Sequence, residues 1–299
     1  MLGNLSLNIS HIETVYYHGS CPDGIIAREV LKLTGKSLKY IPYYFSEFKE
    51  VPKNALFIDC SPKHYQVETA LQNNCLIAEH HDSFDFHYWH PYHSQILFGE
   101  NSNAESGAAL ALWILGAYDP TFHNEKIIEL VDYIAISDTW RKDEIDFDYA
   151  RMLAGYIVFF GNDFCENLES LVDRYETIRA FGKVQENKQK QFAETAMRYH
   201  TPNYKLAFIN ETNMSNAAEI LRQEGNDVVV GFKMLYDTRL SKMMIRYSLR
   251  SNNRFDCAVF CVANGGGGHK AAAGFTLEYV NQDPIMAFLD LFTVYEGML

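Results

Sequence analysis

Short apolar segments alternate with helical patterns in the first half of this chain of 299 residues. Segments rich in β-branched and aromatic residues, which are typical of strands, lie at residues 14–18, 38–44, 55–59 and 75–79. Apolar residues recur at helical spacing at residues 24–33, 64–72, 106–115 and 126–136. Because strands and helices that alternate are joined by right-handed crossovers, the pattern predicts an open, mainly parallel sheet with helices on both faces.

A polar helical pattern over residues 167–199 follows and is interrupted at Thr201, Pro202 and Asn203. Strand patterns resume at residues 205–209, 228–236 and 243–249. The chain is also longer than most single domains. We therefore predict an α/β chain of three parts, with an N-terminal domain at residues 1–165, a helical linker at 166–202 and a smaller α/β domain at 203–299.

The composition limits the class of partner. With 26 basic and 38 acidic residues the net charge is −12, which argues against a protein that coats long duplex nucleic acid. A nucleotide-sized anion needs only a few local cations. Six cysteines without a Cys-x-x-Cys pair predict reduced thiols, and neither a signal-like start nor a membrane-length apolar window is present. We expect a soluble cytoplasmic protein without a membrane partner.

Acidic and histidine side chains follow several of the predicted strands. They are His18 and Asp23 after the first strand, Asp59 at the end of the third, His80 and His81 after the fourth, and Asp138 after a later helix. The carboxyl ends of parallel strands share one edge of a sheet, so these side chains are expected to converge there. Imidazole nitrogen together with carboxylate oxygen suits Mn²⁺, Fe²⁺ or Zn²⁺ better than Mg²⁺. Two such ions about 3.5–4 Å apart can ionise a water for in-line attack on phosphorus.

Each of these residues alone has an ordinary structural explanation. An aspartate after a strand is commonly a helix N-cap, and a histidine at a strand end is commonly a hydrogen-bonded structural residue. The coincidence of four polar motifs, each placed directly after an apolar run, favours the metal site instead.

A glycine run stands out in the C-terminal part. It comprises Gly265, Gly266, Gly267 and Gly268, is followed by His269 and Lys270, and leads into the small-residue stretch 271–274. Glycines can adopt positive φ and aim backbone amides at an anion, and the two basic side chains add donors. The run predicts an anion-binding loop, with an ordinary flexible loop as the alternative.

Arg250 ends a predicted apolar strand in the same part of the chain. Its guanidinium can grip a phosphate or carboxylate with two hydrogen bonds, and a surface ion pair is the structural alternative.

The ordered set of motifs resembles the DHH phosphoesterase family. The N-terminal motifs are HGSCPDG (18–24), FIDCSP (57–62), AEHHDS (78–83) and ISDTW (136–140). The segments YSLRS (247–251) and GGGGHKAAAGF (265–275) resemble the DHHA1 substrate-binding domain of the nucleotide-cleaving branch. The resemblance covers nearly the whole chain and implies a DHH catalytic metal-binding domain at residues 1–165 and a DHHA1-like domain at 203–299.

The resemblance also implies a role for each matching residue. Asp59 would bridge two metal ions. Asp23, His80 and Asp138 would hold one of them, and His18 would help to hold the other. His81 would face the scissile phosphate. Arg250, the glycines 266–268, His269 and Lys270 would contact the substrate in the cleft between the domains.

Two residues depart from the family pattern. Cys21 stands where the first motif usually has its first aspartate, and the histidine of that motif is one residue earlier relative to Asp23 than in some members. Three explanations of Cys21 are therefore open: it is a thiolate ligand, it does not bind metal and the ion beside it is held weakly, or it is a sign of lost activity. Glu79 replaces the namesake aspartate and keeps its charge.

The resulting hypothesis is a two-metal phosphodiesterase or exonuclease. It would cleave short oligonucleotides or cyclic dinucleotides to nucleoside monophosphates, with Mn²⁺ as the expected ion, Mg²⁺, Zn²⁺ or Fe²⁺ as alternatives, and a monomer or homodimer as the working unit. The competing hypotheses are hydrolysis of pyrophosphate, polyphosphate or a nucleoside bisphosphate, and a non-catalytic nucleotide sensor with a degenerate metal site.

Overall fold

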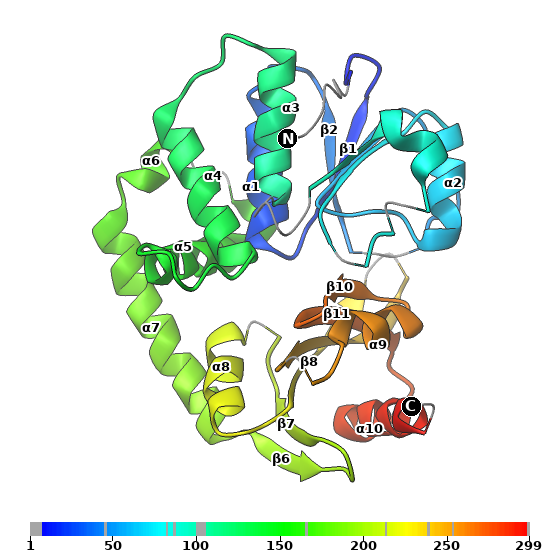
Figure 1. The fold of residues 1–299 in the computed structure, drawn as a ribbon, viewed down its shortest axis with the longest axis vertical. Helices are drawn as coiled ribbons and strands as arrows, with labels where there is room; N and C mark the ends of the chain where they lie inside the picture. The colour runs from blue at the N-terminus through cyan, green and yellow to red at the C-terminus, as the bar shows by residue number, and fades with distance from the viewer. Residues whose placement is uncertain are drawn as a thin grey trace. The chain divides into compact units, whose positions relative to one another are not determined.

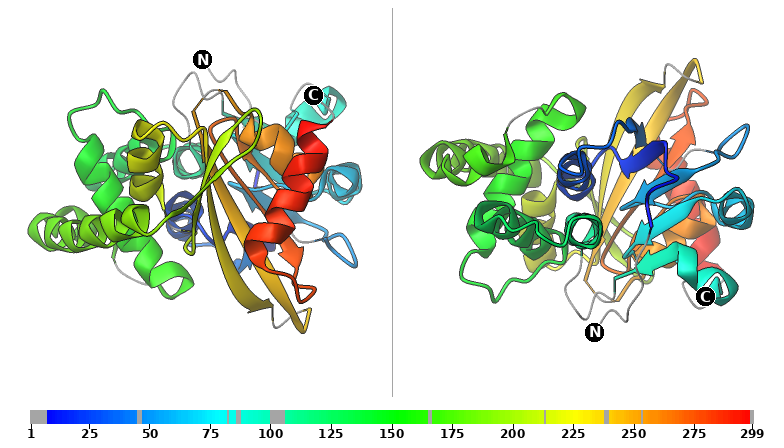
Figure 2. Two further views of the ribbon diagram at one scale, coloured as in Figure 1. Left: turned by 90° about the horizontal axis from the view of Figure 1, so that it is seen from below. Right: turned by 90° about the horizontal axis from the view of Figure 1, so that it is seen from above.

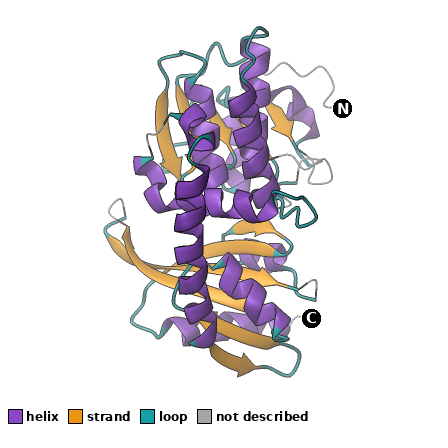
Figure 3. Cartoon of the chain, turned by 90° about the vertical axis from the view of Figure 1, so that its left-hand side faces the viewer, coloured by secondary structure: helices purple, strands orange, loops and turns teal. Residues whose placement is uncertain are grey.

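The computed structural model describes residues 8–44, 47–81, 83–85, 88–99, 106–164, 167–212, 214–237, 240–252 and 254–297 (Figure 1). The chain divides into two compact units, Met1–Val184 and Gln185–Leu299. The division falls inside the long helix α7 (Tyr175–Glu194), which Figure 3 shows as one continuous helix. The three-part domain division remains a prediction.

The first unit contains a five-stranded sheet in the order β2-β1-β3-β4-β5. Its strands are β1 (Thr14–His18), β2 (Lys39–Tyr43), β3 (Ala55–Ile58), β4 (Leu76–Glu79) and β5 (Ile96–Phe98). Every pairing is parallel, which confirms the predicted sheet. The chain leaves β1 toward β2 on one side and returns to β3 on the other, so the strand order reverses beside β1, where open sheets of this kind build their sites.

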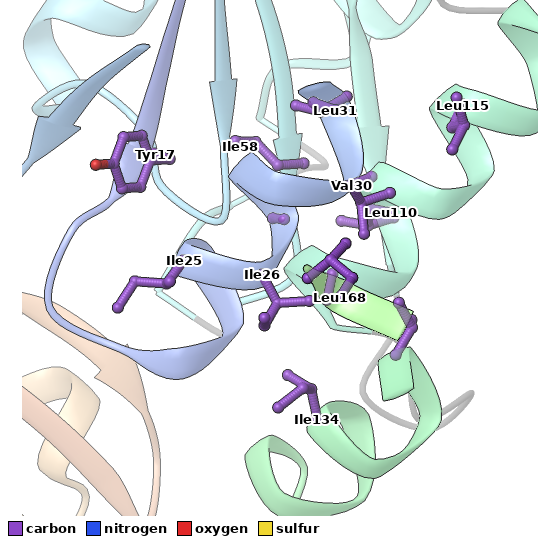
Figure 4. Packing of buried hydrophobic residues seen from close by; sticks show 14 of the residues in the cluster. Tyr17, Ile25, Ile26, Val30, Leu31, Ile58, Leu110, Leu115, Ile134 and Leu168 are labelled. Carbon is purple, nitrogen blue, oxygen red and sulfur yellow. The ribbon is translucent and has the colours of Figure 1, made fainter. Parts of the chain in front are cut away.

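Helices cover both faces of this sheet. α1 (Pro22–Lys32) and α3 (Gly107–Tyr118) lie on one face, and α2 (His64–Gln72) lies on the other. α4 (Glu125–Asp138), α5 (Phe147–Phe160) and α6 (Leu168–Val172) pack against α1, α3 or one another, and the unit also has the 3-10 helices η1 (His90–Gln95) and η3 (Gly161–Asp163). Successive strand residues point to opposite faces. Ile58 packs with Val30 of α1 and Leu110 of α3 in the larger core (Figure 4), whereas Phe57 packs with Val67 of α2 on the other face.

The second unit contains a six-stranded sheet in the order β10-β11-β9-β8-β7-β6. Its strands are β6 (Met197–His200), β7 (Lys205–Ile209), β8 (Val228–Asp237), β9 (Lys242–Ser251), β10 (Gly267–His269) and β11 (Ala272–Glu278), and its further helices are α8 (Ser215–Gln223), α9 (Cys257–Ala263) and α10 (Pro284–Glu296). Only the β7–β8 pairing is parallel among those of the described strands. α9 and α10 pack on one face (Figure 2), and α8 packs on the other face over β7 and β8.

One local prediction was wrong. Residues 197–199 continue the predicted helical pattern but form strand β6, which pairs with β7 in an antiparallel hairpin. All four residues of β6 are exposed, so hydrophobic spacing carries no signal there and the backbone pairing with β7 decides the conformation. In the part of the chain that the structure describes, none of the helices has the length and apolar composition needed to cross a bilayer.

A buried arginine ties α1 to the end of α5. Arg28 is 4% exposed, and its guanidinium donates to Tyr17 Oη at 2.9 Å, to Phe164 O at 2.8 Å and to Asn162 O at 3.1 Å. Arg28 Nε also donates to Glu29 Oε1 at 2.6 Å. These bonds satisfy backbone carbonyls that follow α5, and they fix α1, which carries Asp23 in its first turn.

Replacement of Arg28 by Met should lower the free energy of unfolding of the first unit by about 3 kcal/mol, because it leaves the buried acceptors Tyr17 Oη, Asn162 O and Phe164 O without this donor and leaves Glu29 paired with Lys32 alone. The measurement is urea unfolding followed by tryptophan fluorescence, since Trp89, Trp113 and Trp140 all lie in that unit. The exposed Arg179 on α7 is the matched control, and Arg179→Met should change stability by less than about 1 kcal/mol. Equal effects of the two substitutions would contradict the role of Arg28.

Candidate metal centre

Side chains at the carboxyl ends of β1, β3 and β4 converge at one edge of the N-terminal sheet. Asp59 lies between two histidines: its Oδ1 is 2.9 Å from His80 Nε2, and its Oδ2 is 3.4 Å from His18 Nδ1. Asp59 and His80 are each 1% exposed. The parallel arrangement of the strands thus brings residues 18, 59 and 80 together although they are far apart along the chain.

Two further carboxylates complete one side of the cluster. His80 Nε2 is 3.4 Å from Oδ2 of Asp23, in the first turn of α1, and 3.7 Å from Oδ2 of Asp138, the last residue of α4. Asp23 is fully buried, whereas Asp138 is partly exposed. One imidazole nitrogen therefore faces three carboxylates that come from three different segments.

Cys21 lies on the other side of Asp59. Its Sγ donates to Asp59 Oδ2 at 3.0 Å and is 3.1 Å from His18 Nδ1. The same sulfur accepts the backbone N–H of Gly24 at 3.2 Å, so Cys21 is also the N-cap of α1. One side chain thus both caps α1 and donates to Asp59.

The backbone of Asp59 has an unusual conformation. Its φ is +57°, in the left-handed region, which aspartate enters more readily than most residues. Asp59 N still donates to Ala78 O of β4 at 2.9 Å, so the chain leaves the sheet directly after this bond. The sharp turn aims the carboxylate across the sheet edge toward both histidines.

The donor set fits divalent metal ions. Three groups of three side chains have ligand atoms within 4.8 Å of one another and share Asp59: His18, Cys21 and Asp59; Asp23, Asp59 and His80; and Asp59, Glu79 and His81. The first two contain the residues expected to hold metal. A carboxylate common to two groups is the arrangement that a bridging ligand requires. The residues expected to hold metal therefore lie together, with Asp59 at the centre.

The charges of the cluster are set by its own hydrogen bonds. Burial alone would raise the pKa of Asp59, but hydrogen bonds from His18 and His80 hold that pKa well below its usual value. Burial likewise opposes a charged His80, yet its hydrogen bonds to Asp23 and Asp59 hold the pKa of His80 well above the ordinary value. Burial and the neighbouring carboxylates raise the pKa of the Cys21 thiol.

Glu79 orients the second histidine of the pair. Its Oε2 accepts from His81 Nδ1 at 2.8 Å and from the backbone N–H of His80 at 2.9 Å. Burial disfavours the imidazolium, but the charge of Glu79 outweighs burial and raises the pKa of His81 to about 9. His81 is thus held as a cation, with Nδ1 3.9 Å from Asp59 Oδ1. The glutamate at this position thus holds the His81 ring through its carboxylate.

The N-terminus of α3 was not predicted as part of the site. The backbone N–H groups of Gly107 and Ala108 donate to Asp23 at 2.5 Å and 2.8 Å. These are amides of the first helical turn, where the partial positive charge of the helix stabilises a carboxylate. Ser106 caps α3 by accepting from Ala109 N, and Gly107 directly follows this cap.

The glycine run forms an edge strand and not the expected loop. Gly267, Gly268 and His269 make up β10 and pair with β11. A Cβ on Gly266 or on Gly268 would collide with the backbone of the adjacent strand, and Gly268 has a φ of +134°. The glycines therefore permit close approach of two backbones within the sheet, a role that composition alone does not distinguish from anion binding.

Arg250 and His269 share one face of the C-terminal sheet. Arg250 of β9 and His269 of β10 both lie opposite Ala272 of the intervening strand β11, and residues directly opposite in an antiparallel pair point to the same face. The following rung on that face carries Gly267, Gly274 and Ser248. Two basic side chains thus stand beside small residues, and the exposed Lys270 follows β10.

Residues 203–294 match the DHHA1 domain family. No curated protein matches the sequence. The chain shares its fold with a DHH-domain structure described as a member of the s1p family of ribosomal proteins, with a TM-score of 0.62 and 12% identity over 96% of this chain and 87% of that chain.

Two structures align with lower TM-scores. The pGpG-specific phosphodiesterase PggH from Vibrio cholerae gives 0.45 with 15% identity over 95% of this chain and 99% of its own. RecJ in complex with Mg²⁺ from Thermus thermophilus gives 0.46 with 12% identity over 98% of this chain and 51% of its own.

Replacement of Gly107 by Ala should lower the affinity for Mn²⁺ by at least about 10-fold, because the added Cβ collides with Asp59 Cβ and would lie 2.8 Å from Asp23 Oδ2. Titration calorimetry of the metal-free protein measures this effect, and circular dichroism verifies the fold. Gly116→Ala on the same helix is the matched control, since a Cβ there has no atom within 4 Å. Unchanged affinity in Gly107→Ala would refute the position assigned to α3.

Proposed function

We propose that this chain, whose C-terminal part is a DHHA1 domain and whose fold is that of a DHH-domain protein, is a metal-dependent phosphodiesterase. The proposed substrates are short oligonucleotides or cyclic dinucleotides, and the products are nucleoside monophosphates. The observation that carries the proposal is the buried Asp59 carboxylate, which is shared by the candidate ligand groups His18, Cys21 and Asp59 on one side and Asp23, Asp59 and His80 on the other.

The ligands divide between two ions. Asp23, His80 and Asp138 would hold one ion together with Asp59, and His18 with Asp59 would hold the other. We propose Mn²⁺, which accepts both carboxylate oxygen and imidazole nitrogen. When bound, such a pair of ions supplies an acidified water and neutralises charge on the phosphoryl group.

His81 is the proposed acid or charge stabiliser. Glu79 holds its Nδ1 at 2.8 Å and keeps the ring protonated, so the imidazolium can carry a proton toward the leaving oxygen or offset the negative charge that develops on phosphorus. The buried Glu79 has no access to the substrate, so its role is to position His81.

The C-terminal sheet is the proposed substrate-binding surface. Arg250 and His269 stand on one face beside small residues, and the exposed Lys270 adds a further basic side chain. A guanidinium can grip a terminal phosphate in two bonds. The net charge of −12 favours a short substrate held by a few cations over a long duplex.

A substrate panel tests the activity. Purified protein with Mn²⁺ is incubated with linear and cyclic dinucleotides, oligonucleotides of two to about five residues, pyrophosphate and polyphosphate. We expect nucleoside monophosphates from at least one member and at least about 100-fold slower release in Asp59→Asn, because that substitution removes a bridging charge. Asp173→Asn, which changes an exposed carboxylate outside the cluster, should leave the rate unchanged. Hydrolysis of no nucleotide member would contradict the proposal.

The Arg250→Ala variant tests whether Arg250 contributes to substrate binding without contributing to metal binding. The variant should raise KM by about 10-fold or more, since a charge-assisted hydrogen bond to phosphate contributes roughly 1.5–3 kcal/mol, and its metal content should equal that of the unmodified protein. Lys242→Ala is the control on the same strand, where Lys242 pairs with Glu278 at 2.6 Å. Equal loss of substrate affinity and bound metal in Arg250→Ala would overturn the assignment.

A further inference from the structure

The ligand group around Cys21 differs in chemistry from its neighbour. His18, Cys21 and Asp59 offer one nitrogen, one sulfur and one oxygen, whereas Asp23, Asp59 and His80 offer only oxygen and nitrogen. The two groups share Asp59, so any difference between them comes from the side chains on either side of it. Cys21 is the one sulfur ligand in the groups that the described residues form.

The three ligand atoms of the Cys21 group are nearly as far apart as the ligand atoms of one tetrahedral ion. Sγ is 3.0 Å from Asp59 Oδ2 and 3.1 Å from His18 Nδ1, and Nδ1 is 3.4 Å from Oδ2. Bonds of about 2.0–2.3 Å to a tetrahedral Zn²⁺ place such atoms about 3.3–3.6 Å apart. A shift of a few tenths of an ångström therefore converts the hydrogen-bonded triad into a ligand triad.

Neighbouring groups hold the triad in this arrangement. The backbone N–H of Gly24 donates to Cys21 Sγ at 3.2 Å, which fixes the sulfur at the start of α1. Ser20 Oγ lies 3.0 Å from Nε2 of His18 and leaves Nδ1 as the ring nitrogen that faces Cys21 and Asp59. A second partner on the far nitrogen is the usual way in which proteins orient a ligating histidine. Cys21 and His18 are half-buried, so an ion can reach them from solvent.

We propose that His18, Cys21 and Asp59 form a thiolate-containing site that selects Zn²⁺ or Fe²⁺ over Mn²⁺, so that the protein binds two chemically different ions. Thiolate ligands favour Zn²⁺ and iron, whereas carboxylate-rich sets accept Mn²⁺. On binding, the metal–sulfur bond replaces the S–H bond, and the proton that Sγ donates to Asp59 passes to the solvent. The inference rests on the proposed function only in expecting divalent ions beside Asp59.

Co²⁺ is the probe of this site. Metal-free full-length protein is titrated with Co²⁺, and the near-ultraviolet absorption that arises from charge transfer between thiolate and Co²⁺ is recorded. Zn²⁺ and Mn²⁺ are then added separately as competitors. We expect the band to appear, and Zn²⁺ to abolish it at a concentration at least about 100-fold lower than Mn²⁺ does.

Two variants assign the band to Cys21 without removing the helix cap. Cys21→Asp and Cys21→Ser both retain a side chain that caps α1, so both should fold. Each should lose the charge-transfer band, and Cys21→Asp should lower the preference for Zn²⁺ over Mn²⁺ by at least about 10-fold. Cys60→Ala is the matched control, because Cys60 is a buried thiol next to Asp59 that belongs to none of the ligand groups among the described residues; it should keep the band.

The outcomes separate this inference from the proposed activity. Binding of Co²⁺ without the band, or a band that persists in Cys21→Asp, would overturn the thiolate site and leave the hydrolytic proposal standing. Failure to bind Co²⁺ at all would overturn both the thiolate site and the metal premise of the activity. A Cys21-dependent band in a protein that hydrolyses no substrate would support the site and refute the activity, since the titration uses no substrate.

Discussion

The buried charge of Asp59 is the constraint around which the first unit is organised. A carboxylate in a sheet edge that excludes water costs several kcal/mol unless partners compensate it. Here the compensation comes from His18 on one side and His80 on the other, and each histidine requires its own support. The left-handed backbone of Asp59 is part of the same arrangement, because it aims the carboxylate at both rings.

Contacts between segments that are far apart along the sequence support this buried charge. Asp23 can share His80 because two amides of α3 donate to it and stabilise its negative charge, and α3 can approach that closely because residue 107 has no side chain. The buried Arg28 holds α1, which carries Cys21 at its cap and Asp23 in its first turn. The candidate metal-ligand cluster thus depends on helix ends and on one glycine as much as on the side chains that could hold an ion.

The C-terminal unit depends on a different constraint, the close approach of two strands. Its glycines let β10 and β11 approach closely at the edge of the sheet, and the register of those strands puts Arg250 and His269 on one face. The glycine run and the basic residues are therefore connected through backbone pairing. A loop of the same composition would leave the relative positions of those side chains undetermined.

The sequence alone determined the elements whose signal is local and the chemistry of the candidate ligands. Strands β1 and β7 and helix α2 were predicted with the observed bounds, because the spacing of apolar residues can be read without knowing what lies beside them. The likeness to DHH proteins with a DHHA1 domain is confirmed, because the order of the motifs can be read in the same way. The three-residue strand β5 and the exposed strand β6 carried too little local pattern to be recognised. The tertiary structure alone decided that α3 supports Asp23, that Glu79 holds His81, and that Cys21 both caps α1 and faces Asp59. Those contacts join segments through strand order, helix approach and side-chain direction, which are long-range properties that no local window of residues contains.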